Sequence, residues 1–232
     1  MKKHLWENKN LDSNYECPHC RKGILEYSSE GSIIHQTVSS KKDDEYAKYE
    51  LDEPCAQYQN YYAWTNLKCN KCFESVFCSG EFWDSMDLEG NENEPNFGER
   101  FSPKVFLPTL PIIDIPEGVP ELIKKELETS FELYWINESA CANSLRKVLE
   151  LVMDDKGVEQ NRILHHRIKK FKATENEMLI AIKEIGNAGS HGTVTREYVL
   201  QGYLFLQHCL NDEYGIKSGL ISSAKKITDH LK

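Results

Sequence analysis

The sequence predicts an α+β protein in which a small antiparallel zinc-ribbon sheet is followed by an antiparallel helical bundle. Two Cys-x-x-Cys pairs lie among β-branched and aromatic residues in the N-terminal half, a combination typical of a zinc ribbon. After Pro120, apolar residues recur every three or four positions, which is the spacing of amphipathic helices. We therefore predict a zinc-ribbon module over residues 1–100 with an inserted acidic loop, a proline-rich strap over 101–120 and a helical bundle over 121–232.

The composition is that of a globular protein. The chain has 232 residues, 28% of them charged, and a net charge of −9, so it is long enough to bury a sizeable core. No apolar run approaches the ~18 residues that a membrane span needs. The N-terminal stretch MKKHLWENKN lacks the apolar segment of a secretory signal. We expect a cytoplasmic protein with no membrane segment, in which cysteines stay reduced.

The two cysteine pairs predict one structural Zn²⁺ site. They are Cys17 with Cys20, in CPHC, and Cys69 with Cys72, in CNKC. A two-residue spacer lets both thiolates of a pair bind one ion, and two pairs complete a closed tetrahedral shell. Four thiolates leave no open position for a substrate, which disfavours a catalytic zinc. The alternative is two unrelated redox or free-thiol pairs. Gly23, just after the first pair, suits a tight turn.

The remaining cysteines and one histidine carry less information. Cys55 and Cys78 fall inside the same module and are either spare ligands or small buried residues. Cys141 and Cys209 lie in helical patterns and are expected in the core. His19 stands between the first two thiols and is an alternative ligand.

The rest of the N-terminal module reads as strands and loops. Residues 23–40 predict a hairpin around a Ser-Glu-Gly turn, and the charged residues 41–54 predict a solvated loop. Residues 58–67 and 73–83 predict strands that enter and leave the second cysteine pair. The polar stretch 87–100, with its glycines, asparagines and proline, predicts a boundary.

The second half begins with a proline-rich stretch. Residues 101–120 hold five of the chain's eight prolines, which disfavour a helix and the interior of a sheet. Because the stretch is also apolar, we predict an extended strap packed on the domain that follows. Five or six helices with short connections then imply an antiparallel bundle. Their predicted spans are 120–137, 138–155, 160–172, 175–185, 195–212 and a weaker one over 219–231.

Charge is divided unevenly between the two halves. Residues 1–100 hold 11 basic and 19 acidic residues, a net of −8, whereas residues 101–232 have a net of −1. A zinc ribbon that binds nucleic acid needs a basic face, so the acidic module favours a protein partner. One basic cluster is either a solvated helix face or a surface that contacts the phosphates of RNA, DNA or a nucleotide. Its members are Arg162, Arg167, Lys169, Lys170 and Lys172.

Three separated motifs resemble one family. FLPTLPIIDIP, ESACANSLRKVLELV and EIGNAGSHG occur in this order, and over residues 101–215 the chain resembles the bacterial domain-of-unknown-function family DUF4145. Members occur alone or attached to restriction-endonuclease subunits, which implies a role in defence against foreign DNA. The family is also similar to HEPN helical bundles, many of which are dimeric RNases. The resemblance therefore implies a homodimer formed through the helical domain.

HEPN RNases carry an Arg, a polar residue after it and a His about five positions beyond the Arg. The Arg binds phosphate and the His activates a 2′-hydroxyl. In this sequence His191 matches the His and Asn187 the polar residue, but Gly186 occupies the Arg position. Arg146, from another predicted helix, is a candidate for the missing guanidinium, with Glu150 one turn along. The same two residues, at i and i+4, are equally a simple salt bridge.

These residues leave two functional hypotheses open. Lys183 lies one turn before Asn187, but a lysine does not reproduce the bidentate fork of an arginine. A structural reading has Gly186 end the helix or pack closely, Asn187 cap backbone groups and His191 bond a buried carbonyl. We expect a non-catalytic interaction or regulatory module in a bacterial defence or nucleic-acid-processing system. The alternative is a metal-independent HEPN-type RNase that uses His191 and Asn187.

Overall fold

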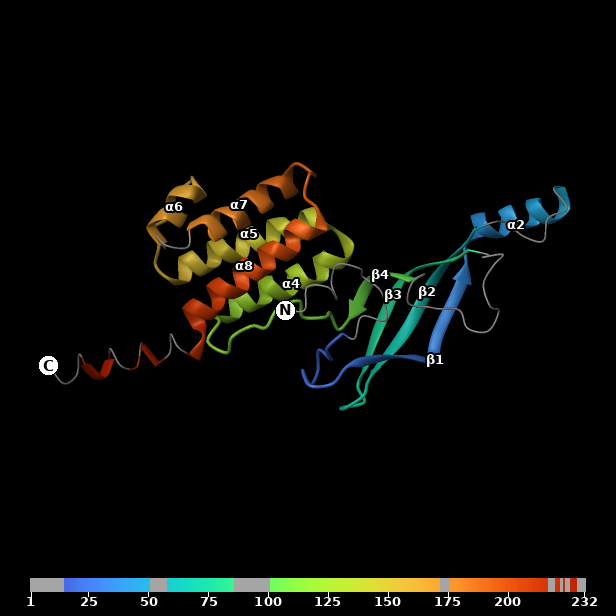
Figure 1. The fold of residues 1–232 in the computed structure, drawn as a ribbon, viewed down its shortest axis with the longest axis horizontal. Helices are drawn as coiled ribbons and strands as arrows, with labels where there is room; N and C mark the ends of the chain where they lie inside the picture. The colour runs from blue at the N-terminus through green and yellow to red at the C-terminus, as the bar shows by residue number, and fades with distance from the viewer. Residues whose placement is uncertain are drawn as a thin grey trace. The chain divides into compact units, whose positions relative to one another are not determined.

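The structure, a computed structural model, describes residues 15–50, 58–85, 101–171, 176–216, 220–221, 223 and 226–228. The chain divides into two compact units, one over Lys2–Leu110 and the other over Pro111–Lys232. The first unit contains an antiparallel sheet and the second contains helices (Figure 1), which confirms the predicted α+β class. Within the described residues, no helix combines the length and apolarity that crossing a membrane requires.

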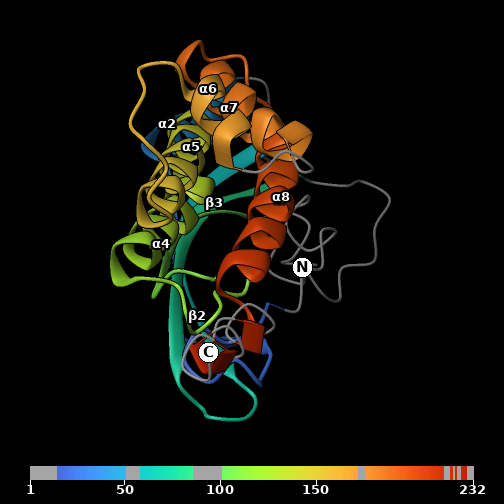
Figure 2. The same cartoon turned by 90° about the vertical axis from the view of Figure 1, so that its left-hand side faces the viewer.

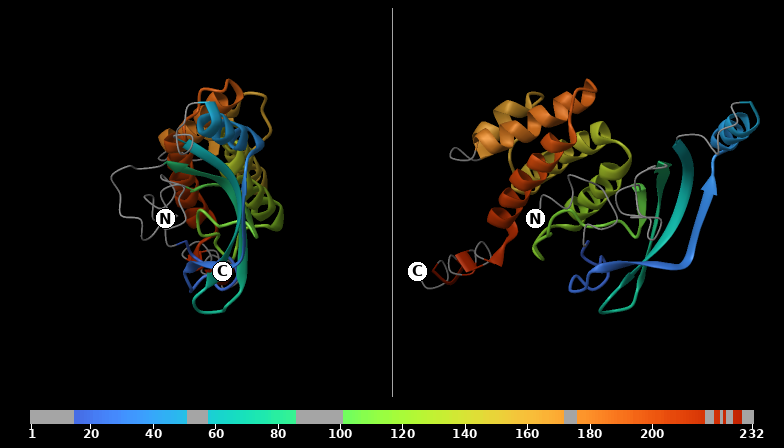
Figure 3. Two further views of the ribbon diagram at one scale, coloured as in Figure 1. Left: turned by 90° about the vertical axis from the view of Figure 1, so that its right-hand side faces the viewer. Right: turned by 45° about the vertical axis from the view of Figure 1, so that its right-hand side comes forward.

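The sheet has four antiparallel strands in the order β1 (Leu25–Gln36), β2 (Tyr58–Cys69), β3 (Ser75–Ser85) and β4 (Phe101–Leu107). Figure 3 shows the long, twisted strands β2 and β3 running side by side. Side chains alternate between the two faces of a strand. On β2, Ala63, Thr65 and Leu67 are accordingly buried, whereas Tyr62 and Trp64 are exposed. The sheet therefore has one buried face and one exposed, aromatic face.

Residues 23–40 do not form the predicted hairpin. A single strand, β1, spans most of this stretch and pairs with β2, with a shift of register between Ser28 and Ile33. Gly31, which was expected in a hairpin turn, has a φ of 78° within this irregularity. A glycine adopts a left-handed conformation at little cost, so it serves a β-bulge as readily as a turn. The chain continues in the same direction after the bulge.

Residues 41–50 do not form the predicted loop, because they belong to helix α2 (Val38–Glu50). This stretch is rich in Lys and Glu, which favour helices even where nearly all side chains face water. Thr37 Oγ1 accepts a hydrogen bond of 3.2 Å from the N–H of Ser40, as an N-cap residue does. The Ser40 hydroxyl in turn accepts a 3.1 Å bond from the N–H of Asn60, which connects α2 to β2.

The predicted strap over 101–120 is wrong for its first seven residues. Phe101–Leu107 form β4, which pairs with β3 and places Pro103 opposite Gly80. Because β4 is an edge strand, the N–H that a proline lacks is not needed by a further neighbour. A Cβ on Gly80 would lie 2.2 Å from the carbonyl oxygen of Ser102, so only glycine admits β4 this closely. The boundary between the units accordingly falls after Leu110 rather than after residue 100.

The helical unit contains α4 (Glu121–Ile136), α5 (Glu138–Asp155), α6 (Leu164–Phe171), α7 (Asn176–Ser190) and α8 (Arg196–Tyr214). These five helices confirm the predicted ones, while the weaker sixth, over 219–231, falls largely outside the described residues. The Asn137 side chain caps α5 by accepting a 2.9 Å bond from the N–H of Ala140. Figure 2 shows α4, α5 and α8 as neighbouring rods.

The core of the helical unit contains a small polar network. The Tyr203 hydroxyl donates a 2.9 Å hydrogen bond to Ser130 Oγ and lies 3.2 Å from the Cys141 sulfur. Tyr203 is fully buried, and this burial, which comes first among the causes, raises the pKa of its hydroxyl well above the usual value. Cys141 and Cys209 are both buried, which confirms that they are core residues.

Candidate metal centre and catalytic cluster

The four predicted ligands Cys17, Cys20, Cys69 and Cys72 converge at one end of the sheet. Their sulfur atoms all lie within 4.8 Å of one another. The sulfurs of Cys17 and Cys72 are 3.6 Å apart, and those of Cys20 and Cys69 are 3.7 Å apart. Sulfur atoms bound ~2.3 Å from a tetrahedral zinc would be about 3.8 Å from one another. The cluster is therefore close enough to hold one metal ion, and its dimensions are compatible with zinc.

The two cysteine pairs adopt the same local turn. The N–H of Arg21 donates to the carbonyl of Cys17 at 3.0 Å, and the N–H of Phe73 donates to that of Cys69 at 3.1 Å. Arg21 and Phe73 each follow the second cysteine of a pair, and both have positive φ angles, of 54° and 63°. Non-glycine residues adopt this conformation only where the surroundings demand it. The repeated, strained turn is what directs both pairs of thiols toward a common point.

Backbone N–H groups face the sulfur atoms. Gly23 donates to Cys20 Sγ, and Lys71 and Cys72 donate to Cys69 Sγ, each at 3.4 Å. Burial by itself raises the pKa of Cys69, but the N–H groups of Cys72 and Lys71 outweigh it and lower that pKa to about 6. Cys69 is consequently available as a thiolate at neutral pH, which is the form that binds metal.

The other candidate ligands do not join this cluster. Cys78 is buried in β3, and the burial raises the pKa of its thiol, so it behaves as a small core residue. His19 is exposed and is not among the grouped metal-ligating atoms. Cys55 lies outside the described residues. Of the described candidates, only the four cysteines of the two pairs come together.

In the helical unit, three of the four candidate catalytic residues come together between α5 and α7. Arg146 Nη1 donates a 2.8 Å hydrogen bond to Asn187 Oδ1, and Arg146 Nε donates to Glu150 Oε1 at 3.1 Å. Asn187 Nδ2 donates in turn to Glu184 Oε2 at 3.0 Å. Lys183 also contacts Glu184, and the hydrogen bonds from Lys183 and Asn187 lower the pKa of that carboxyl. The guanidinium is thus held by neutral and acidic groups on two helices.

Two glycines allow this contact. A Cβ at Gly186 would lie 2.7 Å from Arg146 Cβ and 2.9 Å from Arg146 Cδ. A Cβ at Gly189 would lie 2.7 Å from the carbonyl oxygen of Ser139. The arginine of α5 therefore fills the space that a side chain at position 186 would need. Gly186 does not end the helix, because α7 continues to Ser190 and Gly192, with a φ of 70°, follows it.

His191 stands apart from the arginine network. It is exposed in the turn after α7, where its N–H donates to the carbonyl of Ala188 at 3.1 Å. In the part of the chain that the structure describes, its imidazole makes no hydrogen bond to a buried carbonyl, so the structural role expected for it is wrong. Because His191 lies in this exposed turn, its ring is accessible from solvent.

Only some residues of the predicted basic cluster are exposed. Arg167 is 3% exposed, forms an ion pair with Asp154 and donates a 3.2 Å bond to the carbonyl of Val158. Lys170 pairs with Glu159 at 2.7 Å, and its hydrogen bond lowers the pKa of that carboxyl. Arg167 therefore anchors α6 and cannot contact phosphates, which corrects the prediction. Arg162 and Lys169 are exposed, and Lys172 lies outside the described residues.

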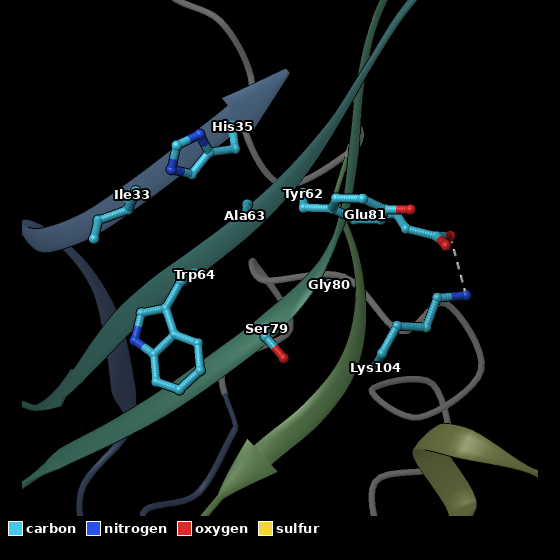
Figure 4. A pocket seen from close by; sticks show the side chains of 9 residues that line it. All are labelled: Ile33, His35, Tyr62, Ala63, Trp64, Ser79, Gly80, Glu81 and Lys104. Atoms are coloured by element: carbon cyan, nitrogen blue, oxygen red, sulfur yellow. Dashed lines mark ion pairs between the residues drawn. The ribbon is translucent and has the colours of Figure 1, made fainter. Parts of the chain in front are cut away.

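The exposed face of the sheet was not predicted as a site. Figure 4 shows Trp64 and Tyr62 of β2 between Ile33 and His35 of β1 and the residues of β3. These side chains surround an open hollow of about 520 Å³, at whose edge Lys104 Nζ lies 3.3 Å from Glu81 Oε2. The signal in the sequence is YYAWTN, in which two large aromatic residues at alternate positions must share one face of a strand.

Comparison with known families matches two domains. Residues 6–108 match a domain of unknown function, DUF8608, and residues 128–230 match a domain of unknown function, DUF4145. No curated protein and no solved structure shows a significant match to the chain. Each matched segment lies within one of the two compact units. The DUF4145 match falls on the helical half, whose motifs predicted a resemblance to that family, while the N-terminal half matches a second family model.

Proposed function

We propose that this chain is a non-catalytic protein-binding module, in which one structural zinc ion holds the N-terminal sheet in shape. Tetrahedral sites with four thiolates suit zinc, and such a closed shell offers a substrate no open position. Among the described residues no cysteine forms a disulfide, as expected of thiol ligands in a reducing compartment. The metal then has the role of fixing the end of β2 at Cys69 and, with it, the adjoining strands.

The exposed face of the sheet is the observation that supports binding. Tyr62 is 64% exposed and Trp64 is 47% exposed. Exposed apolar residues continue this face on the adjoining strands, with Ile33 opposite Trp64 on β1 and Phe77 on β3, and beyond them Val105 and Leu107 on β4. Contiguous apolar patches rimmed by polar groups mark interaction sites, and aromatic residues carry much of the energy of such interfaces. The net charge of −8 on residues 1–100 favours a protein over a nucleic acid as the partner.

Photo-crosslinking tests this function directly. A photoreactive phenylalanine analogue placed at Tyr62 or Phe77 should form a discrete protein adduct in the cells that make the chain. Tyr49 of α2, which is 74% exposed but lies off the sheet, provides the control position. Adducts from Tyr62 and Phe77, and none of the same size from Tyr49, support the proposal. Equal adducts from all three positions, or none, would overturn it.

The Arg146–Asn187 contact keeps RNase activity as a second candidate function. The guanidinium lies 2.8 Å from the residue that matches the HEPN polar position, and the matching His191 is accessible. In an RNase, Arg146 would stabilise the phosphate and His191 would exchange a proton with the 2′-hydroxyl. Glu150 and Glu184 oppose this, because they surround the cation and its partner with negative charge.

An RNA cleavage assay separates the two functions. Structured RNA would be incubated with the unmodified chain and with His191→Ala, Arg146→Ala and His166→Ala variants. His166 is exposed on α6 and provides a matched histidine control. We expect no cleavage that depends on His191. Cleavage lost in the first two variants and kept in the third would establish the RNase and displace the non-catalytic function.

We further propose that the module works in a bacterial defence or nucleic-acid-processing system. The support is the resemblance of its helical half to domains that occur attached to restriction-endonuclease subunits. A strain that lacks the chain should then resist phage infection or foreign DNA less well than its parent. Equal plating of a panel of phages on both strains, with equal transformation by unmodified DNA, would contradict this setting.

A further inference from the structure

The exposed face of the sheet presents two aromatic residues whose polar atoms are available to a ligand. Tyr62 and Trp64 alternate along β2, so their backbones are about 7 Å apart. Figure 4 shows the two side chains pointing away from each other, with the short side chain of Ser79 beside Trp64. Within the described residues, neither the Trp64 indole N–H nor the Tyr62 hydroxyl has a hydrogen-bond partner. The hollow of about 520 Å³ is therefore bordered by ring faces and by these donors.

The charges on this face cancel. Lys104 of β4 pairs with Glu81 of β3 at 3.3 Å, and Glu26 of β1 lies opposite Lys68 of β2. Proteins that stack single strands of nucleic acid on aromatic rings do so in a positively charged groove, which these paired charges do not provide. A charged peptide likewise meets no net countercharge here. The face therefore fits an uncharged, largely apolar segment that accepts hydrogen bonds.

We propose that this hollow binds a proline-rich segment of a partner protein in the polyproline II conformation. The inference rests on the proposed binding function and names the kind of partner. A polyproline II segment has no internal hydrogen bonds, so its carbonyl oxygens can accept from Trp64 and Tyr62. Proline lacks an N–H, so the segment needs few acceptors from the sheet. Grooves lined by aromatic residues are the surfaces that bind such segments.

Other peptide conformations suit the face less well. The carbonyls of a helix are paired within the helix, so a docked helix would cover the Trp64 and Tyr62 donors and displace their water without replacing its hydrogen bonds. A β-strand adds to the edge of a sheet rather than to its face. A proline-rich segment is also extended before it binds, so it loses little conformational entropy.

Titration with decaproline tests the inference, because this uncharged peptide adopts the polyproline II conformation. In ¹H–¹⁵N NMR spectra of the full chain, decaproline should shift the indole N–H signal of Trp64, which a Trp64→Phe variant assigns. The indole signal of Trp135, which is buried in the helical unit, should not move. A glycine–serine peptide of equal length is the control for a flexible chain, and oligouridine is the control for nucleic acid. Neither should shift the Trp64 signal.

Three substitutions separate ring contacts from hydrogen bonds. Trp64→Ala removes a ring and should weaken the binding of fluorescently labelled decaproline at least about tenfold. Trp64→Phe and Tyr62→Phe keep a ring but remove a donor, and each should weaken binding about two- to tenfold. Tyr49→Phe, on helix α2 rather than on the sheet, is the matched control and should bind as tightly as the unmodified chain. Retained metal and far-UV circular dichroism check that each variant folds.

Three outcomes would overturn the inference. They are a Trp64 signal that decaproline does not shift, a signal that shifts equally with the glycine–serine peptide or with oligouridine, and decaproline binding that survives Trp64→Ala. Competition separates this inference from the proposed function: decaproline added to a cell lysate should remove the adduct formed by a photoreactive residue at Phe77. An adduct that persists at saturating decaproline defeats the inference but leaves the proposed function standing.

Discussion

Gly23 and Cys69 are 46 residues apart in the sequence, yet a Cβ at Gly23 would lie 2.2 Å from the sulfur of Cys69. Real Cβ atoms do not approach another atom this closely, so a side chain at residue 23 must displace the sulfur of Cys69, one of the four candidate metal ligands. The importance of Gly23 is therefore steric: because it has no side chain, it leaves room for the second cysteine pair. The first pair can close on the second only because this position lacks a side chain.

Gly23→Ala should therefore weaken metal binding. The added methyl group pushes Cys69 Sγ away from the other three sulfurs, so the shell loses its tetrahedral form. Metal content per chain, measured by mass spectrometry after dialysis against a weak chelator, should fall well below that of the unmodified chain. Gly31→Ala is the control for backbone strain without a clash: its φ of 78° disfavours alanine, but a methyl group there meets nothing within 4 Å, so this variant should keep its metal. Equal metal in both variants would contradict the role of Gly23.

Removal of the ligands should unfold the sheet unit before the helical unit. The unmodified chain should contain about one zinc per chain. Cys17→Ser combined with Cys69→Ser should abolish binding, and a strong chelator should have the same effect on the unmodified chain. Helical circular dichroism should largely persist, because the helical unit forms its own core. Cys78→Ala, which changes a buried thiol outside the cluster, should keep its metal; loss there would show that the site is misassigned.

Metal affinity should decrease as the pH is lowered. The pKa of Cys69 is lowered from 9.0 to about 6, so its thiolate favours the folded site at pH values above 9. This contribution shrinks as the pH falls and is lost once it drops below about 6, when the thiol is protonated. Protons also compete with the metal for all four thiols. A competition titration with a coloured zinc chelator should show a steep loss of affinity on the acid side of that value; a flat profile would argue against thiolate ligands.

Gly186→Ala should destabilise the helical unit although alanine is the better helix former. The new methyl group would meet Arg146 Cβ at 2.7 Å, and overpacking of this kind costs about 1–3 kcal/mol. Urea unfolding followed by circular dichroism measures the change. Gly202→Ala in α8 is the control, because its methyl group meets the end of the Leu145 side chain at 3.1 Å, where a small shift relieves the contact. That variant should be close to neutral.

Arg167→Ala should reduce stability much more than Lys170→Ala. Arg167 is buried against Asp154, and removal of one member of a buried ion pair costs about 3–5 kcal/mol. The partial exposure of Asp154 places the expected loss at the lower end of this range. Lys170 and Glu159 are both exposed, and such pairs contribute about 0–1 kcal/mol. Thermal unfolding of both variants checks the difference, and similar losses would indicate that Arg167 does not anchor α6.

The sequence by itself determined the features that depend on local spacing. The two-residue spacers of the cysteine pairs predict four candidate ligands, because both thiolates of such a pair can reach one ion, and the structure brings these four sulfur atoms together. Helices α4, α5, α7 and α8 follow from their apolar period, since burial of one face depends on residues three and four apart. The motifs around Arg146 and Asn187 likewise predicted the DUF4145 family, which the family comparison confirms over residues 128–230.

The tertiary structure alone decided what depends on approach between distant segments. Gly31 reads as a turn in sequence, but pairing with β2 carries β1 through it as a bulge. Residues 101–107 read as a strap, but an open edge of β3 beside Gly80 accepts a proline-containing strand. In the sequence, Gly186 stands where the HEPN motif has an arginine. In the structure, close packing of α5 on α7 places the Arg146 side chain in the space beside Gly186. A glycine or an open strand edge in the sequence shows only that another segment can approach closely at that position. Which segment does so depends on how the whole unit packs.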